Sequence, residues 1–186
     1  MGKLTLILGG ARSGKSTYAE KLAMRKGERV AYIATSQALD EEMQNRIAVH
    51  RQKRPASWQT YEIPSRVGQN LLQTPLQADV ILLDCLTLLV ANRLLEVAPD
   101  VDQPDASVSE TEIKDEIECL LEAIQAIPAE WIIVSNEVGL GLVPPYPLGR
   151  IYRDLLGWAN QRLGLIADRV VFMIAGMPMN LTKAEE

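Results

Sequence analysis

The chain has few cysteines, a deficit of basic residues and no long apolar run, and each shortage excludes a class of protein. Its two cysteines, Cys85 and Cys119, lack the spacing of a metal site, and we expect both to be reduced and buried, as in the cytosol. The net charge of −5 argues weakly against nucleic acid as the main partner. No apolar run reaches transmembrane length and the chain enters a strand-like run at once, so we expect neither a membrane span nor a signal peptide.

The length and composition predict one domain that covers residues 1–186, because 186 residues suffice for one good-sized core and are too few for two. A hydrophobic content of 47% with 23% charged residues is ordinary for a globular protein. Short apolar runs alternate with helical patterns along the chain. This alternation predicts an α/β fold with a mostly parallel central sheet and helices on both faces.

The most specific motif is Gly9-Gly10-Ala11-Arg12-Ser13-Gly14-Lys15-Ser16, which fits the phosphate-loop pattern G-x-x-x-x-G-K-[ST]. An apolar run precedes it and a helical pattern follows, which is the strand–loop–helix context that the motif needs. The glycines let backbone N–H groups converge on one anion, and the helix adds its positive N-terminal end. We therefore predict a P-loop NTPase fold of the RecA-like type, with Lys15 at the β- and γ-phosphates. A glycine-rich turn that fits by chance is the less favoured alternative.

Two oxygen ligands for Mg²⁺ are predicted beside this loop. Ser16 ends the motif, and its hydroxyl is placed to ligate the ion. Asp84 ends the buried strand over residues 80–84, which is the Walker B pattern of a carboxylate that serves the metal directly or through water. A hydrophobic strand that ends in aspartate is weak evidence by itself, and the phosphate loop makes it specific.

Further nucleotide contacts are predicted at the ends of two other strands. One apolar run ends at Ala34 and is followed by Thr35 and Ser36, whose hydroxyls lie where parallel strands present ligands. The alternative is that one hydroxyl caps the next helix. Glu62 ends another short strand, where a carboxylate can accept a hydrogen bond from a base or a ribose hydroxyl.

His50 is the chain's single histidine and lies on a helix predicted within residues 40–54. The cations around it depress the pKa of an imidazole and bind polyphosphate, so a neutral His50 is a candidate covalent nucleophile at phosphorus. The alternatives are a structural histidine and a solvated basic face. Three of these cations follow it directly: Arg51, Lys53 and Arg54.

Three further predictions concern the second half of the chain. Residues 109–112, Ser-Glu-Thr-Glu, fit a capping box that begins a helix. Asn136 and Glu137 follow a strand and open a glycine-rich loop, which indicates the edge of a site, although an ordinary turn is the alternative. Residues 177–186 are expected to form a frayed polar tail.

Together these pieces resemble one family, the bifunctional adenosylcobinamide kinase/adenosylcobinamide-phosphate guanylyltransferases of cobalamin biosynthesis. The His50 segment and the Asn136 loop carry most of the specificity, and the match runs in order through nearly the whole chain. The matching stretches are residues 9–16, 32–37, 40–43, 46–47, 50–55, 136–139, 153–154 and 160–162, with Trp58, Thr60, Glu62 and Pro144.

The resemblance implies two reactions in a cytoplasmic enzyme. One transfers the γ-phosphoryl group of ATP or GTP to adenosylcobinamide, and the other moves GMP from GTP onto the resulting phosphate through a guanylyl-histidine, which falls by position on His50. The resemblance further implies that Gly9 to Ser16 hold the triphosphate and that Asp84 serves Mg²⁺ or nucleotide. It also implies that the protein is a homotrimer, and that the residues after His50 contact the guanine nucleotide: Arg51, Gln52, Lys53 and Arg54. The group that activates the corrinoid hydroxyl is not evident, and Glu137 and Asp84 are both candidates.

Two other functions compete with this interpretation. A simple small-molecule P-loop kinase with a structural His50 would form no covalent nucleotide adduct. A nucleotide-dependent switch or assembly module would need a partner surface, and the sequence marks none clearly.

Overall fold

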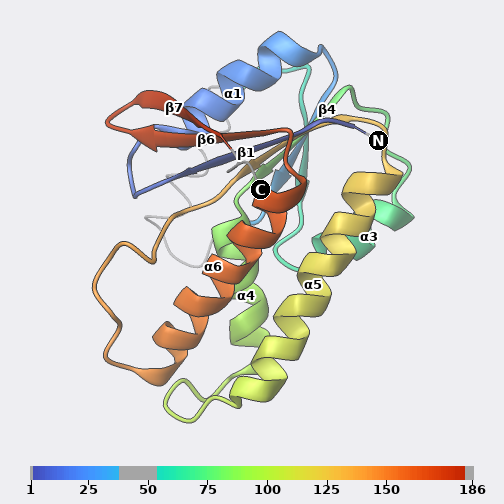
Figure 1. Cartoon of the computed structure of the whole chain (residues 1–186). Coiled ribbons are helices and arrows are strands. Elements are labelled where there is room, and N and C mark those ends of the chain that lie inside the picture. Colours follow the sequence, from blue (N-terminus) through green and yellow to red (C-terminus); the bar gives the residue numbers. More distant parts are fainter. Residues whose placement is uncertain (1, 38–53, 183–186) are drawn as a thin grey trace.

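The protein is described by a computed structural model over residues 2–37 and 54–182, and its centre is a seven-stranded sheet (Figure 1). The strands lie in the order β3-β2-β4-β5-β1-β6-β7. Their bounds are Leu4–Gly9 (β1), Val30–Ala34 (β2), Gln59–Glu62 (β3), Val80–Asp84 (β4), Glu130–Val134 (β5), Arg169–Ile174 (β6) and Met177–Leu181 (β7). The helices are Lys15–Lys26 (α1), Val67–Gln73 (α3), Leu86–Val97 (α4), Ala106–Ala126 (α5) and Pro147–Ile166 (α6).

The sheet is parallel except for β7, which pairs antiparallel with β6. The central strands β2, β4 and β5 are almost entirely apolar and buried, as expected where helices cover both faces of a parallel sheet. Since β1, β2, β4 and β5 run in one direction, their carboxyl ends meet at one edge of the sheet. Ligands bind at this edge in open α/β sheets.

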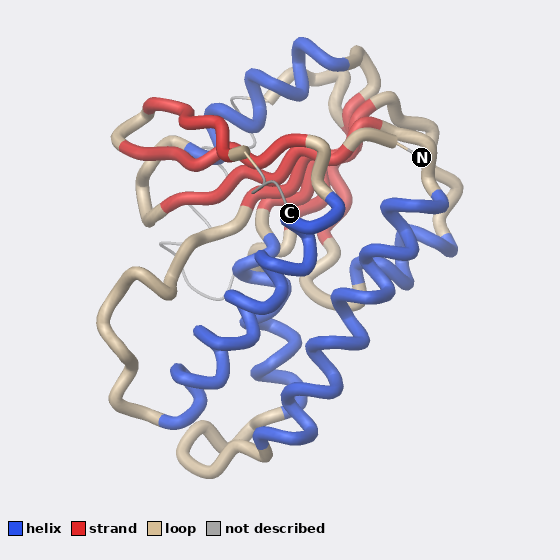
Figure 2. The backbone as a smooth tube through the Cα atoms, viewed as in Figure 1, coloured by secondary structure: helices blue, strands red, loops and turns tan. Residues whose placement is uncertain are grey.

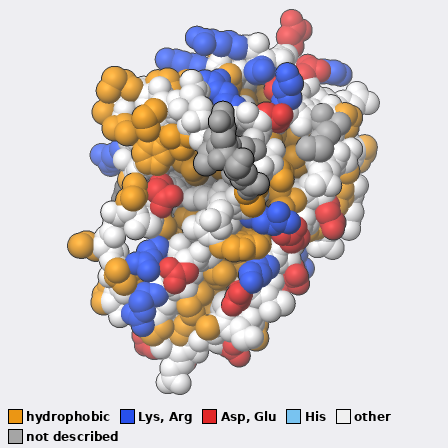
Figure 3. All heavy atoms as spheres, viewed as in Figure 1, with side chains coloured by type: hydrophobic (Ala, Val, Ile, Leu, Met, Phe, Trp, Pro, Cys, Tyr) orange, Lys and Arg blue, Asp and Glu red, His pale blue; other side chains and the backbone are white. Residues whose placement is uncertain are grey.

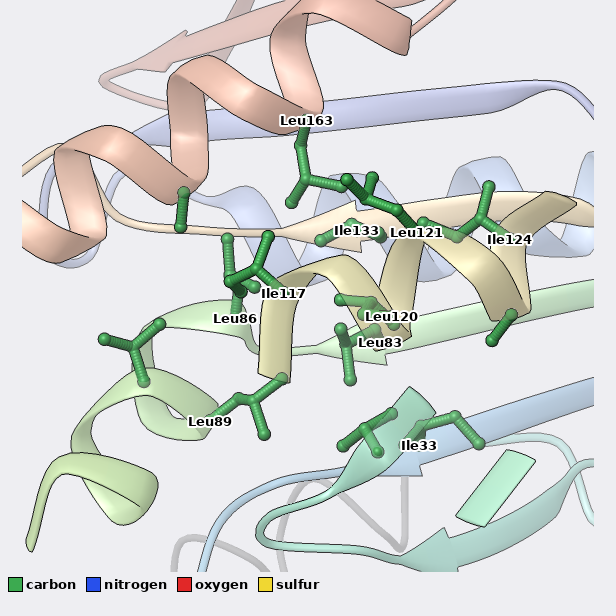
Figure 4. Packing of buried hydrophobic residues seen from close by; sticks show 14 of the residues in the cluster. Ile33, Leu83, Leu86, Leu89, Ile117, Leu120, Leu121, Ile124, Ile133 and Leu163 are labelled. Atoms are coloured by element: carbon green, nitrogen blue, oxygen red, sulfur yellow. The ribbon is translucent and has the colours of Figure 1, made fainter. Parts of the chain in front are cut away.

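Helices cover the two faces of the sheet unequally (Figure 2). Of the described helices, α1 packs on one face, where its Ala19 and Ala23 share a buried cluster with apolar side chains of the strands such as Ile7 and Val134. On the other face α3, α4, α5 and α6 form a larger core with the strands. Figure 4 shows part of that core, where Leu120 and Ile117 of α5 lie among side chains of β4 and α4. The prediction of helices on both faces is confirmed.

Two predicted segments differ from the structure. Residues 177–181 are not a frayed tail, because β7 completes an antiparallel hairpin with β6. Helix α5 begins at Ala106 rather than at Ser109, because the Asp105 side chain accepts hydrogen bonds from the N–H groups of Ser107 and Val108. Ser109 is therefore buried inside the first turns of the helix.

Apolar side chains lie exposed at several places on the face drawn in Figure 3, and one group is prominent. It lies at the upper left of that view, where Figure 1 places the β6–β7 hairpin. Ile174, Met177 and Met179 are between 48% and 66% exposed there. No helix in the described ranges is long and apolar enough to cross a membrane. Both cysteines are free thiols. They are half-buried, whereas from the sequence we expect them to be buried.

Candidate functional site

The phosphate-loop motif forms the turn between β1 and α1, and two of its glycines are required by its shape. Gly14 has φ 95° just before α1, and Gly9 has φ 148° at the end of β1. A Cβ atom on Gly9 would lie 2.5 Å from the carbonyl oxygen of Met173, on the neighbouring strand β6. The turn therefore depends on residues without side chains. It places the N-terminal end of α1 at the carboxyl edge of the sheet, where an anion is favoured.

Lys15 is folded back over this turn. Its Nζ donates a hydrogen bond of 2.6 Å to the carbonyl oxygen of Gly10, and its side chain is mostly buried. Burial lowers the pKa of Lys15, while the nearby Asp84 carboxylate acts in the opposite direction. A bound phosphate would add a further negative charge beside this ammonium, so the position favours binding of a polyphosphate.

Asp84 connects three elements at the end of β4. Its Oδ1 accepts a hydrogen bond of 3.3 Å from Ser16 Oγ, and its Oδ2 accepts one of 2.7 Å from the Tyr32 hydroxyl of β2. A hydroxyl and a carboxylate are the oxygen ligands that Mg²⁺ prefers, and in nucleotide sites one or two such groups suffice because phosphates and water complete the shell. Among residues 2–37 and 54–182 there is no group of three or more His, Cys, Asp and Glu side chains that could hold a metal ion.

These groups line a common cavity of about 510 Å³. The phosphate loop forms one wall, and the ends of β4 and β5 form the other. Cys85 and Asn136 stand at these strand ends. Burial raises the pKa of Cys85 to about 11, so its thiol stays neutral at physiological pH and is not a thiolate nucleophile. The backbone N–H of Asn136 donates to Thr87 Oγ1 at 2.7 Å, which fixes this part of the rim.

The predicted contacts at the other strand ends lie beside this cavity. Ala34 pairs with Asp84 on one side and with Glu62 on the other, so the three residues form one row across β4, β2 and β3. Thr35 is fully buried, and its hydroxyl both accepts from the Cys85 N–H and donates to the Cys85 carbonyl at 2.8 Å. That hydroxyl holds the start of α4 against β2. Ser36, next along the chain, is half-buried.

Arg54 is packed into the protein rather than directed to solvent. Its guanidinium lies 3.3 Å from the centre of the Tyr32 ring, and its Nε is 3.9 Å from Glu20 Oε1. Trp58 stacks on the same ring at 6.3 Å between centroids, so the residue acts in packing. The remaining members of the predicted basic segment lie outside the described residues: His50, Arg51, Gln52 and Lys53.

Sequence reasoning placed Tyr32 and Asn160 in stretches that resemble the family but gave neither a role at the site, and it missed Thr87. Tyr32 contacts the proposed metal carboxylate. Thr87 and Asn160 hold the backbone of Asn136 through a hydrogen bond on each side. Tyr32 lies inside β2 and Asp84 at the end of β4, 52 positions later. Only the strand order makes them neighbours, and no local pattern reveals that order.

Comparison with known proteins places the chain among enzymes of one pathway. A family model described as "CobU: Cobinamide kinase / cobinamide phosphate guanyltransferase" matches residues 5–181. The chain is 46% identical to the bifunctional adenosylcobalamin biosynthesis protein CobP of Pseudomonas aeruginosa over 176 residues, or 95% of each chain. It is 42% identical to the bifunctional adenosylcobalamin biosynthesis protein CobU of Salmonella typhimurium over 180 residues, which cover 96% of this chain and 99% of that protein.

A solved structure gives independent support for the fold. The RadB recombinase superposes with a TM-score of 0.50 and covers 92% of this chain and 74% of its own. The two sequences are only 16% identical, so this likeness concerns the fold alone. Together with the parallel sheet and the phosphate loop, it confirms the predicted RecA-like α/β fold.

Proposed function

Since the chain belongs to the cobinamide kinase / cobinamide phosphate guanyltransferase family, we propose that its single domain carries out two successive group transfers onto a corrinoid. The protein is a transferase of cobalamin biosynthesis that uses nucleotide substrates. The observation that carries the proposal is the convergence of Lys15, Ser16 and Asp84 on one cavity beside the phosphate loop. Residues 1–186 would form one catalytic unit.

In the first reaction, the aminopropanol hydroxyl of adenosylcobinamide attacks the γ-phosphorus of ATP or GTP. The new bond joins the hydroxyl oxygen to phosphorus, the bond to the β-phosphate oxygen breaks, and the hydroxyl proton goes to a base. The N–H groups of residues 9–16 and the Lys15 ammonium would hold the negative charge. Ser16 and Asp84 would hold Mg²⁺, which neutralises charge on the phosphates when it is bound.

We propose Glu137, rather than Asp84, as the base that accepts the hydroxyl proton in this step. Both oxygens of Asp84 already accept hydrogen bonds, one from Ser16 and one from Tyr32. Glu137 follows Asn136 at the cavity rim and accepts one hydrogen bond of 2.7 Å, from the Gly139 N–H. Glu137 therefore has more acceptor capacity left for a substrate proton.

In the second reaction, the His50 imidazole attacks the α-phosphorus of GTP and pyrophosphate leaves. The phosphate of adenosylcobinamide phosphate then attacks the same phosphorus, which restores the histidine and gives adenosylcobinamide-GDP. Ala34, Ser36 and Glu62 are proposed to contact the guanine nucleotide, and Thr35, whose hydroxyl bonds Cys85, is proposed to hold Ala34 and Ser36 in place. Their support is that Ala34 and Glu62 share one row with Asp84 at the ligand edge of the sheet.

The basic segment that follows His50 would meet the triphosphate, with Arg51, Gln52 and Lys53 as direct contacts. Arg54 is already engaged by the Tyr32 ring and by Glu20. Its proposed part in nucleotide binding is therefore to attach the segment to the wall of the site.

We also propose a cytoplasmic homotrimer. Two free cysteines suit a reducing compartment, and the exposed apolar side chains of β7 offer a surface for contact between subunits. Sedimentation equilibrium of the purified protein tests the assembly: a single species of three chains supports it, and a monomer contradicts it.

The kinase half is tested with γ-labelled ATP, Mg²⁺ and adenosylcobinamide. We expect label to appear on the corrinoid, and a further GMP-sized mass to be added when GTP is also present. Lys15→Ala should abolish the first transfer in a protein that still folds. Label on the corrinoid without any later GMP addition would favour the simple kinase with a structural His50.

A further inference from the structure

Residues 138–146, here called the apolar loop, join β5 to α6 and run down the left side of Figure 1. No charged residue occurs between positions 138 and 149, although 23% of the whole chain is charged. Four of the side chains point to solvent: Leu140 is 82% exposed, Leu142 96%, Val143 61% and Tyr146 55%. Such a concentration of exposed apolar side chains indicates a binding surface rather than an ordinary turn.

The apolar loop has a defined shape. Nη1 of Arg150 donates hydrogen bonds to the carbonyl oxygens of Pro144 and Pro145, at 3.2 and 2.7 Å. The Gly141 N–H donates to the carbonyl oxygen of Val138 at 3.2 Å. Leu148, just after the loop, is buried in the core. The exposed side chains are therefore presented by a braced backbone.

Gly149 is necessary for this bracing. A Cβ atom at that position would lie 2.5 Å from a ring carbon of Tyr146 and 2.7 Å from Cβ of Pro144. Only glycine lets the loop lie this close to the first turn of α6. The chain thus folds the loop tightly onto the helix while its leucines remain outside.

The apolar loop begins at the rim of the phosphate cavity. Asn136, two residues before it, lines the cavity. The Glu137 N–H donates a hydrogen bond of 3.1 Å to the carbonyl oxygen of Gly9, at the end of β1. A ligand that reaches the phosphate loop with one end can therefore rest the remainder of its surface on the apolar loop.

We propose that Leu140, Leu142, Val143 and Tyr146 bind the ring system of the corrinoid substrate; the inference rests on the proposed function. The acceptor hydroxyl is carried on a side chain of a broad macrocycle rimmed with methyl and neutral amide groups. That hydroxyl must enter the cavity while the macrocycle stays outside. An uncharged apolar surface that starts at the rim can pack against this macrocycle. It has no charged side chain that would bind a phosphate-rich or strongly charged partner.

The test compares the double variant Leu140→Ser/Leu142→Ser with Leu95→Ser. Leu95 is a control because it is also exposed, at 54%, but lies away from the cavity. It is nine residues along α4 from Leu86, which follows the cavity residue Cys85, and this spacing corresponds to about 13 Å along the helix axis. Binding of adenosylcobinamide is measured by equilibrium dialysis from its visible absorbance. GTP affinity, melting temperature and molar mass by light scattering are measured on the same samples.

We expect the double variant to bind adenosylcobinamide about tenfold more weakly or worse, because it loses two apolar contacts. Its GTP affinity, melting temperature and molar mass should stay those of the unaltered protein, and Leu95→Ser should change nothing. Unchanged corrinoid affinity would overturn the inference. A fall in molar mass would instead assign the loop to contact between copies of the chain. If the unaltered protein binds GTP but no corrinoid, the proposed function itself fails.

Discussion

The Tyr32 hydroxyl donates a hydrogen bond of 2.7 Å to Oδ2 of Asp84, and the other oxygen of that carboxylate accepts from Ser16. Burial and the Asp84 charge raise the pKa of Tyr32 well above its ordinary value, so the hydroxyl keeps its proton at any working pH. Trp58 and Arg54 both pack against the ring and fix its place. Tyr32 therefore orients the carboxylate that is proposed to serve Mg²⁺.

Tyr32→Phe keeps the ring and removes this hydrogen bond. We expect the Mg²⁺ concentration for half-maximal phosphoryl transfer and for nucleotide binding to rise about tenfold or more, as for other groups that orient metal ligands. Stability should fall by about 1 kcal/mol. Tyr61→Phe is the matched control, because the Tyr61 hydroxyl bonds Gln59 at the surface. Equal Mg²⁺ dependence in both variants would show that Tyr32 serves packing alone.

Gly9→Ala and Gly10→Ala form a pair that tests the shape of the phosphate loop. A Cβ on Gly9 meets the Met173 carbonyl oxygen in a backbone with φ 148°, whereas a Cβ on Gly10 meets no atom within 4 Å. We expect Gly9→Ala to lose about 1–3 kcal/mol of stability and most of its nucleotide affinity. Gly10→Ala should fold normally. Nucleotide titration and chemical denaturation measure both effects, and similar behaviour of the two variants would contradict the described loop.

Thr35→Val tests which part Thr35 plays. Its hydroxyl bonds both the N–H and the carbonyl oxygen of Cys85, so the variant leaves two buried backbone groups without that partner. We expect a loss of about 1–3 kcal/mol in unfolding free energy with little change in GTP affinity. Ser36→Ala should lower GTP affinity and change the unfolding free energy little. A large loss of GTP affinity in a fully stable Thr35→Val protein would make Thr35 a direct nucleotide contact.

The raised pKa of Cys85 has a measurable consequence. Its pKa is about 11 instead of the ordinary 9.0, so the thiolate fraction at pH 8 is lower by about a hundredfold. We expect iodoacetamide to alkylate Cys85 in the native protein at least a hundredfold more slowly than in the unfolded chain. The rate should increase tenfold per pH unit up to about pH 11. Mass spectrometry of the peptide measures the alkylation, and rapid reaction of the native protein at pH 8 would contradict a neutral, half-buried thiol.

The parts of the site that could be predicted are local in sequence. The phosphate loop is recognisable from eight consecutive residues, and Asp84 is recognisable because it ends an apolar run. The hydrogen bond between Tyr32 and Asp84 forms because β2 and β4 are neighbours in the sheet. No local sequence pattern predicts that strand order. The fixed position of Arg54 depends on the same arrangement together with α1, which carries Glu20.

The two errors in secondary structure also have physical causes. The short Met177–Leu181 segment contains a proline, and its polar and apolar residues alternate only weakly. It forms a strand because β6 supplies a partner. Asp105 and Ser109 both suit the start of a helix. Asp105 is used because its carboxylate accepts from two N–H groups and lets α5 begin a turn earlier.

The central claim is that one chain performs both kinase and guanylyl transfer chemistry, and the covalent intermediate tests it most directly. The purified protein is incubated with α-labelled GTP and Mg²⁺, denatured, and weighed by intact mass spectrometry beside His50→Ala. We expect an acid-labile adduct of the mass of GMP on the unaltered protein and none on the variant. A folded protein that binds GTP and forms no adduct would contradict the claim and leave a kinase with a structural histidine.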